Sequence, residues 1–248
     1  MPSRTPTRFP AGTTNVDKFK QFGSIQMPDP QRFHLFVEDW DRYVATDYTL
    51  TETQAGATQA LANGDGGLML FTNSAANADV CSLQKVGESF IFEDKMAIFG
   101  KVRFQVSDAT LSDALCGLAV TDTSPIASAP SDGIYFLKST AQTGVVFRVG
   151  KASSYTVSAS ILTMANATNY TLGFACNGVQ YSVNGVLSYV FNLFAGTDHN
   201  PPFITKLYVP VTNTPTAQTM TPTLSLQNGA AAAKTLTSDY MVFGKSRF

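Results

Sequence analysis

The sequence predicts an all-β protein built as an antiparallel β-sandwich, and three observations support this class. Apolar and polar residues alternate with a period of two in several segments, most clearly over 96–106, as expected for half-buried strands. Asn-Gly pairs at 177–178 and 184–185 supply the turns of β-hairpins. Only 14% of the 248 residues are charged, below the roughly one quarter of an average domain, and no segment has the periodicity of a long helix.

The first 32 residues are predicted to form an extended N-terminal arm. They hold five prolines, and their five basic and two acidic residues give a net charge of +3. Proline fixes φ and biases the preceding residue towards extended backbone, so the segment does not favour a fold of its own. A frayed tail is the alternative. If it is an arm, its candidate contact residues are Arg4, Arg8, Phe9, Phe19 and Phe22.

Residues 33–248 are predicted to form a single sandwich domain, and its first half contains six predicted strands. In 96–106, Ile98, Val102 and Phe104 share one face and Lys101 and Arg103 the other. The run 114–120 is apolar on both faces, which is typical of a central strand. The six predicted strands are 33–37, 67–72, 96–106, 114–120, 133–138 and 145–151.

The second half continues with strands and one proline-rich segment. Strands are predicted at 155–161, 170–176, 179–183, 186–191, 223–227 and 235–243. With turns at both Asn-Gly pairs, the segments from 170 to 191 are expected to form a three-stranded meander. Five prolines make 195–222 a long, mostly irregular loop.

This loop is also the candidate self-association surface. Its apolar residues Phe203, Ile204, Leu207 and Tyr208 stand among the prolines. The alternative is that the loop packs on its own sandwich.

Charge, cysteine content and hydropathy exclude several functional classes. The chain has 17 basic and 18 acidic residues, and this balance argues against a nucleic-acid partner. No apolar run is long enough for a membrane span, and the N-terminus does not resemble a secretory signal. Cys116 and Cys176 lie in apolar runs and are predicted to be buried. We therefore expect synthesis in a cytoplasm, and neither a cofactor nor a metal site.

The order of strands and turns resembles the concanavalin A-like jelly roll of the laminin-G, lectin and glucanase proteins. Three segments carry the resemblance: Phe36-Val37-Glu38-Asp39-Trp40, Tyr181-Ser182-Val183-Asn184-Gly185, and Leu236-Thr237-Ser238-Asp239-Tyr240-Met241-Val242. In that family the strands equivalent to the first and last of these segments lie side by side. Glucanases of the family carry a closely spaced pair of carboxylates on one strand. The four glutamates here, Glu38, Glu52, Glu88 and Glu93, do not have that spacing, so we expect no enzymatic activity.

More narrowly, the chain resembles jelly-roll structural proteins of tailed bacteriophages. The matching segments are 8–15 in the arm, 61–68, 106–110, and 226–229 before the last strand. The resemblance implies a virion protein of the capsid decoration or cement type. Such a protein is made in the cytoplasm of the host bacterium, binds the outer surface of the head, and links neighbouring major capsid proteins. As a homo-oligomer, a dimer or a trimer, it would fit a symmetric shell.

The alternative is a non-catalytic carbohydrate-binding module for host attachment, carried on a phage fibre or head appendage. A glycan is a partner only under this alternative. Its candidate contacts are Trp40, Tyr181 and Tyr189, because aromatic rings stack on sugars. Asp39 and Asp41 could assist Trp40 with a sugar or a calcium ion, and 63–67 could also supply oxygen ligands. A buried Trp40 and a tight turn at 63–67 are the structural alternatives.

Overall fold

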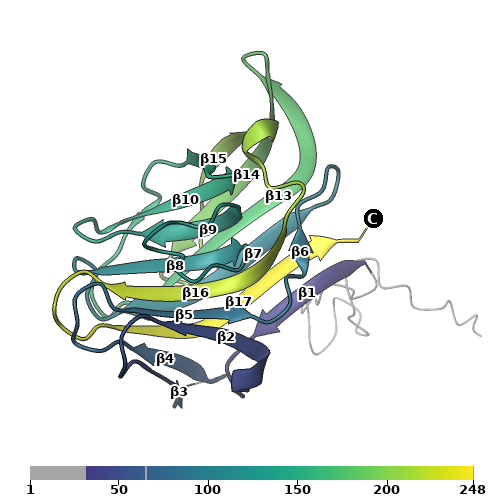
Figure 1. Cartoon of the computed structure of the whole chain (residues 1–248). Helices are drawn as coiled ribbons and strands as arrows, with labels where there is room; N and C mark the ends of the chain where they lie inside the picture. Colours follow the sequence, from purple (N-terminus) through teal and green to yellow (C-terminus); the bar gives the residue numbers. More distant parts are fainter. Residues whose placement is uncertain (1–31, 65, 248) are drawn as a thin grey trace, which may run out of the picture.

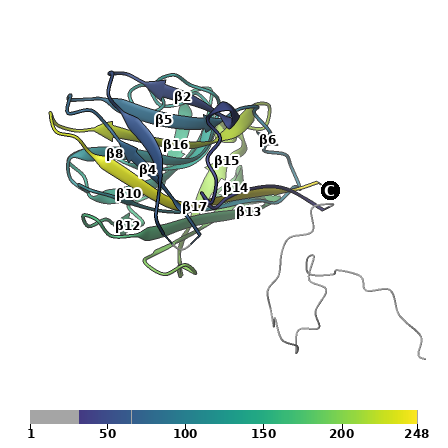
Figure 2. The same ribbon diagram turned by 90° about the horizontal axis from the view of Figure 1, so that it is seen from below.

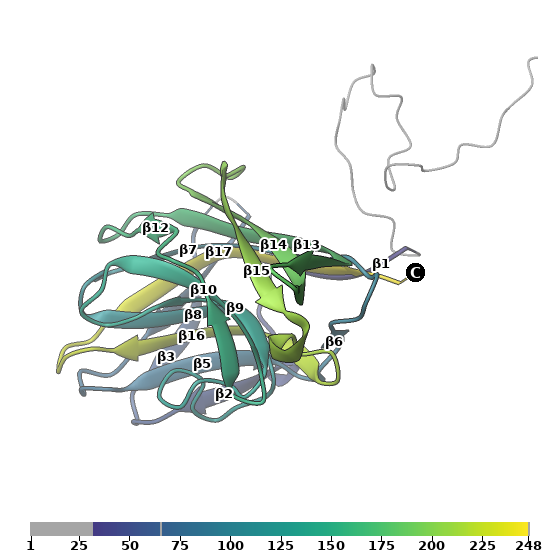
Figure 3. The same ribbon diagram turned by 90° about the horizontal axis from the view of Figure 1, so that it is seen from above.

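The structure, a computed structural model, describes residues 32–64 and 66–247. These residues form two antiparallel β-sheets stacked as a sandwich (Figure 1), which confirms the predicted all-β class. Figures 2 and 3 show the sheets as separate layers. The only helices among the described residues are two short 3-10 turns, η1 (Ala45–Asp47) and η2 (Val211–Asn213), and no helix there could span a bilayer.

The first sheet has eight strands and contains both the first and the last strand of the sandwich. β1 (Phe33–Glu38) pairs with residues 241–246 of β17 (Thr235–Ser246), and β4 (Leu68–Thr72) pairs with residues 235–238 of the same strand. Phe36 of β1 lies opposite Phe243 of β17. The early and late strands therefore lie side by side, as the resemblance implied. The remaining seven strands follow the order β15 (Phe203–Pro210), β14 (Val186–Gly196), β13 (Tyr170–Val183), β7 (Ile98–Val106), β17 (Thr235–Ser246), β4 (Leu68–Thr72) and β3 (Thr58–Ala62).

The second sheet has nine strands. Its central strand β8 is almost entirely buried, as predicted from its apolar sequence on both faces. Two short strands lie off the main order: β12 (Leu162–Thr163) pairs with β10, and β6 (Phe90–Ile91) pairs with β16. The main order is β11 (Ser154–Val157), β10 (Gly144–Lys151), β9 (Gly133–Lys138), β8 (Ser112–Ala119), β16 (Thr219–Asn228), β5 (Val80–Lys85) and β2 (Tyr48–Glu52).

The core lies between the sheets and is rich in phenylalanine. Phe136 and Phe147 come from the nine-stranded sheet, and Phe174, Phe191 and Phe243 come from the eight-stranded sheet. Neighbouring ring centroids in this group lie 4.9–6.4 Å apart. Each buried phenylalanine contributes on the order of 2 kcal/mol through removal of apolar surface from water. The core therefore fixes the relative position of the two sheets.

Two sequence-based predictions about local structure are wrong. Asn177-Gly178 does not form a hairpin turn, because β13 continues through it as a bulge. Only Asn184-Gly185 turns the chain, with both φ angles positive, as a type I′ turn requires. The segment 195–222 is not mostly irregular either. It contains the edge strand β15, and its prolines lie at or beyond the ends of that strand, apart from Pro222 inside β16.

All three cysteines are buried and unpaired, as predicted for Cys116 and Cys176. Burial raises the pKa of Cys81 to about 12 and that of Cys176 to about 11. Each therefore packs as a small apolar side chain rather than as a reactive thiolate.

Candidate functional site

The three aromatic residues predicted to contact a glycan occupy two different environments. Trp40 and Tyr189 are each only 1% exposed, whereas Tyr181 is 43% exposed. Trp40 donates a hydrogen bond from its indole nitrogen to Ser238 Oγ, 3.1 Å away, and Tyr189 packs edge-on against Phe92. Neither buried ring can stack on a sugar, so the glycan prediction is wrong for Trp40 and Tyr189.

The residues predicted for self-association lie on the free edge of the eight-stranded sheet. Phe203, Ile204 and Tyr208 expose between 41% and 51% of their surface. Leu207 differs from them, because it is partly buried and packs against the core. Self-association through β15 stays a prediction.

The candidate arm residues Arg4, Arg8, Phe9, Phe19 and Phe22 lie outside the described residues. The arm itself, its boundary at residue 32, and the decoration role that depends on it stay predictions.

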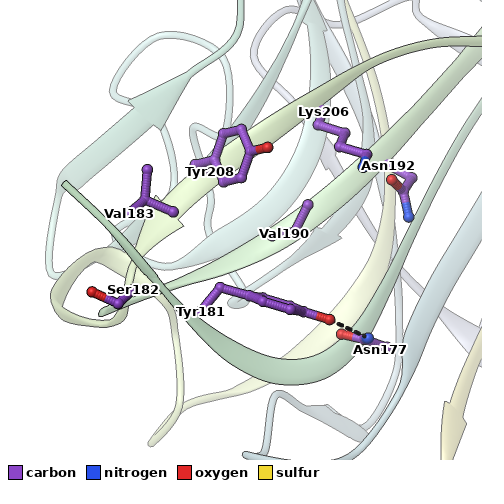
Figure 4. Close-up of a pocket in the computed structure, with 8 residues that line it drawn as sticks. All are labelled: Asn177, Tyr181, Ser182, Val183, Val190, Asn192, Lys206 and Tyr208. Atoms are coloured by element: carbon purple, nitrogen blue, oxygen red, sulfur yellow. Dashed lines mark hydrogen bonds between the residues drawn. The ribbon is translucent and has the colours of Figure 1, made fainter. Parts of the chain in front are cut away.

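The structure brings Tyr181 and Tyr208 together at one pocket of about 420 Å³. Figure 4 shows their rings on either side of Val190. The sequence predicts Tyr181 as a glycan contact and Tyr208 as a self-association residue. They lie on β13 and β15, which are separated in the sheet by β14. Eight residues line the pocket: Asn177, Tyr181, Ser182, Val183, Val190, Asn192, Lys206 and Tyr208.

The register of β14 with β15 places the polar lining residues next to one another. Val190 lies opposite Tyr208, and Asn192 lies opposite Lys206. These four residues alternate with the core residues of their strands, so they face away from the sandwich interior. The pocket therefore lies on the outer face of the eight-stranded sheet.

A bulge in β13 gives this face its hollow shape. Cys176 lies opposite Phe191 and Gln180 opposite Tyr189, so residues 177–179 of β13 share the single partner Val190. Such a bulge bends a strand, and Figure 1 shows β13 curving along its length. The curve carries Tyr181 and Val183 around the face that Val190 occupies.

Gly178 is required at the bulge. Its φ is +72°, and a Cβ there would lie 2.3 Å from the carbonyl oxygen of Met96. Lys95 donates a 2.8 Å backbone hydrogen bond to the Gly178 carbonyl, which ties the bulge to the loop before β7. The Asn-Gly pair thus has a local role, but the role is to bend a strand rather than to end it.

Asn177 orients the ring of Tyr181. Its Oδ1 accepts a 3.0 Å hydrogen bond from the backbone of Val179, and its Nδ2 donates a 3.1 Å hydrogen bond to the Tyr181 hydroxyl. Opposite them, the side chains of Asn192 and Lys206 have no hydrogen-bond partner among the described residues. Lys206 is also the single charged residue among the eight. The pocket thus offers two aromatic faces, the free amide group of Asn192 and one ammonium group.

Part of the outer face of the nine-stranded sheet is covered by the chain itself. Leu115, Tyr135 and Leu137 form a small apolar cluster on that face, and Ile126 of the β8–β9 loop packs against it. The same loop accepts a hydrogen bond from the Gln84 side chain at the Val120 carbonyl, over 3.2 Å. The loop therefore covers this apolar cluster.

A second hollow of about 400 Å³ lies beside Trp40, residues 61–64, Gly66 and Gly67. Gly67 has a φ of +105°, and a Cβ there would lie 2.2 Å from the Trp40 carbonyl oxygen. This supports a tight turn packed on the backbone of Trp40. Among residues 32–64 and 66–247, no cluster of three or more His, Cys, Asp or Glu side chains could hold a metal ion.

The four glutamates are dispersed, and each has a local partner. Glu38 accepts a hydrogen bond from Tyr48, Glu52 from Gln59, and Glu88 from Thr219, while Glu93 pairs with Lys245. None of them lines the pocket. The prediction that the protein is not an enzyme stays a prediction.

Comparison with solved structures places the sandwich in the concanavalin A-like lectin/glucanase fold. An endo-1,3-β-glucanase from Streptomyces sioyaensis aligns with a TM-score of 0.57 at 9% identity, over 87% of this chain and 97% of its own. Arcelin-5, a lectin-like defence protein from Phaseolus vulgaris, aligns with a TM-score of 0.52 at 8% identity, over 86% and 98%.

The fold also matches a phage module. The CBM2 module of the evolved Dit protein of Lactobacillus casei BL23 phage J-1 aligns with a TM-score of 0.51 at 10% identity, over 88% of this chain and 97% of that one. No protein-family model and no curated protein sequence matches the chain. Identities this low establish the shared fold alone.

Sequence reasoning missed Asn177, Asn192 and Lys206 as site residues. A usable signal was present in β14, where Tyr189, Phe191 and Leu193 alternate with Val190 and Asn192. That alternation places Tyr189 inside and Asn192 outside. No comparable signal showed that β15 would pair with β14 and bring Lys206 alongside.

Proposed function

We propose that the protein is a non-catalytic carbohydrate-binding module, and that its glycan is held in the pocket between Tyr181 and Tyr208. The observation that carries the proposal is the convergence of two half-exposed tyrosine rings with free amide and ammonium groups in one hollow. In biological terms, the module attaches a phage particle to the surface of its host.

The lining has the chemistry that sugar recognition needs. A pyranose ring has apolar C–H faces that pack on aromatic rings and hydroxyl edges that need hydrogen-bond partners. Tyr181 and Tyr208 supply the rings, and the amide of Asn192 can donate and accept at neighbouring hydroxyls. At about 420 Å³, the pocket is large enough for one or two sugar units.

The same lining supports binding rather than turnover. Glycoside hydrolysis uses two carboxylates facing one glycosidic bond. None of the eight lining residues is an aspartate or a glutamate, and none is a cysteine or a histidine. The lining groups with acid-base chemistry are Lys206 and the two tyrosines, and none of them has a carboxylate beside it in the lining.

The comparisons favour the attachment role over capsid decoration. Arcelin-5 is lectin-like, and the Dit module is named as a carbohydrate-binding module on a phage. The resemblance of this sequence to structural proteins of tailed phages agrees with the match to the phage Dit module. Decoration rests on the arm, so no contact among the described residues supports it.

Binding to a glycan array, with Tyr181→Ala and Tyr208→Ala as variants, tests the proposal. Loss of one stacking ring costs about 1–2 kcal/mol, so each variant should bind about 5- to 30-fold more weakly. Phe203→Ala is the matched control, because Phe203 is an equally exposed aromatic on β15 outside the pocket lining. If no glycan is bound by the wild type, or if Phe203→Ala weakens binding as much as the tyrosine variants, the proposal is wrong.

A further inference from the structure

We infer that the glycan of this pocket is acidic, and that Lys206 binds its carboxylate or phosphate group. The inference rests on the proposed function and specifies the class of ligand. Its starting point is that the pocket has one cation and no anion among its lining residues.

The other cations on the same face of the sheet are already engaged. Lys101 and Arg103 alternate with the buried Val102 and Phe104 on β7, so they face outward as Lys206 does. Lys101 donates to the His199 carbonyl over 2.9 Å and lies over the Tyr240 ring.

Arg103 is engaged both by an ion pair and by hydrogen bonds. It forms an ion pair with Asp239 at 3.0 Å, and it donates to the Thr197 carbonyl at 2.6 Å. These two side chains hold the loop after β14 against the sheet. Their contacts explain why they are on this face.

Lys206 has no such contact. It is exposed, and no carboxylate, carbonyl or ring among the described residues accepts its ammonium group. It lies opposite Asn192 across the β14–β15 pair, and in Figure 4 these two side chains lie close together at one side of the pocket. The amide and the ammonium can therefore donate to the same ligand oxygens.

A charged ligand gains more here than a neutral one. A hydrogen bond between an ammonium group and a carboxylate or phosphate is shorter and stronger than one to a hydroxyl. Because Lys206 is exposed, a neutral glycan can leave it hydrated at little cost. Acidic glycans should therefore be preferred, by about threefold at low salt, and the preference should fall as salt screens the charge.

The test is calorimetric titration of the full chain with matched tetrasaccharides. The backbones are β-1,4-glucan, β-1,4-mannan and β-1,4-galactan, each in neutral, 6-carboxylate and 6-phosphate form. We expect an acidic form to bind about threefold more tightly than its neutral counterpart in low salt, with most of the difference lost at about 0.5 M salt. The carboxylate and phosphate forms distinguish the two sources of negative charge.

Lys206→Gln should remove the preference, so that the acidic forms bind the variant no more tightly than their neutral counterpart does. Lys85→Gln is the matched control, since Lys85 is a partly exposed lysine of the other sheet, and it should keep the preference. If the wild type binds neutral and acidic forms equally, the inference is overturned and the proposed function stands. If no form binds while the protein is folded, both are overturned.

Discussion

Asn177 donates a hydrogen bond of 3.1 Å to the hydroxyl of Tyr181, four residues further along the same strand. In a regular strand, residues four positions apart point to the same face. Their Cα atoms lie about 13 Å apart, which is far for such a bond. The bulge at 177–179 shortens the path between them. The pocket is therefore held in shape from within β13, independently of the ligand.

The first prediction concerns this hydrogen bond. Asn177→Ala removes both the bond to Tyr181 and the bond from the Val179 backbone, so the ring loses its fixed orientation. We expect glycan affinity to fall about three- to tenfold, with little change in the far-ultraviolet circular dichroism. Asn213→Ala is the control, because Asn213 lies on η2 outside the pocket lining. Equal affinity of Asn177→Ala and wild type would contradict the orienting role.

Trp40 is expected to affect stability rather than binding. Trp40→Phe reduces buried surface and leaves Ser238 Oγ without its indole partner, which should lower the free energy of unfolding by about 1–3 kcal/mol. Urea denaturation followed by circular dichroism measures the change. The affinity of the folded variant for glycan should equal that of the wild type, since Trp40 does not line the pocket. A folded variant without glycan binding would contradict this placement.

The free energy of unfolding is expected to depend on pH through Lys138. Burial lowers its pKa to about 8, although Asp113 and Asp108 act in the opposite direction. An unfolded lysine keeps its proton up to about pH 10.5, so the unfolded state binds more protons between pH 8 and pH 10.5, and stability rises with pH there. The loss of stability from burying the charged Lys138 is fully present below pH 8.

Comparison with Lys138→Met isolates this contribution from that of the cysteines, whose raised pKa values act in the opposite direction above pH 9. The unfolding free energy of the wild type, minus that of the variant, should increase by about 2 kcal/mol from pH 8 to pH 10. A flat difference for Lys138→Met would show that Lys138 keeps its proton in the folded state.

Deletion of residues 1–31 separates the two proposed roles of the protein. The truncation keeps Arg32, whose carbonyl accepts a 2.8 Å hydrogen bond from the backbone of Arg247, so β1 should still pair with β17. The carbohydrate-binding proposal predicts unchanged glycan affinity in calorimetry. The decoration prediction requires instead that the truncated protein no longer load onto phage heads in a sedimentation assay. Retained loading would remove the arm from that role.

The sequence predicts the sandwich well because its strands carry their own pattern. β7 alternates buried Ile98, Val102 and Phe104 with outward Lys101 and Arg103, and this pattern needs no partner strand to be recognised. β15 is harder to predict, because an edge strand exposes most of its residues and shows little alternation. The strand is evident only once its pairing with β14 is known.

The pocket could be predicted only in part. Tyr181 carries its own signal as an aromatic residue near a hairpin, whereas Lys206 and Asn192 are ordinary polar residues until the register places them opposite one another. The two Asn-Gly pairs also look alike in the sequence. Contact of Gly178 with the loop at Met96, 82 positions earlier, decides that the first pair bends the strand, and such a distant contact leaves no local trace.

The pairing of β1 with β17 has a mechanical consequence. Phe33 lies opposite Ser246, and the two strands run antiparallel from that point. Tension applied between these residues loads the outermost pair of hydrogen bonds first, so β1 should peel away one pair at a time under force. A bound host glycan would instead pull on β13, β14 and β15, at the other end of the strand order. The strand pair that would peel and the strands that line the pocket are therefore separated by β7.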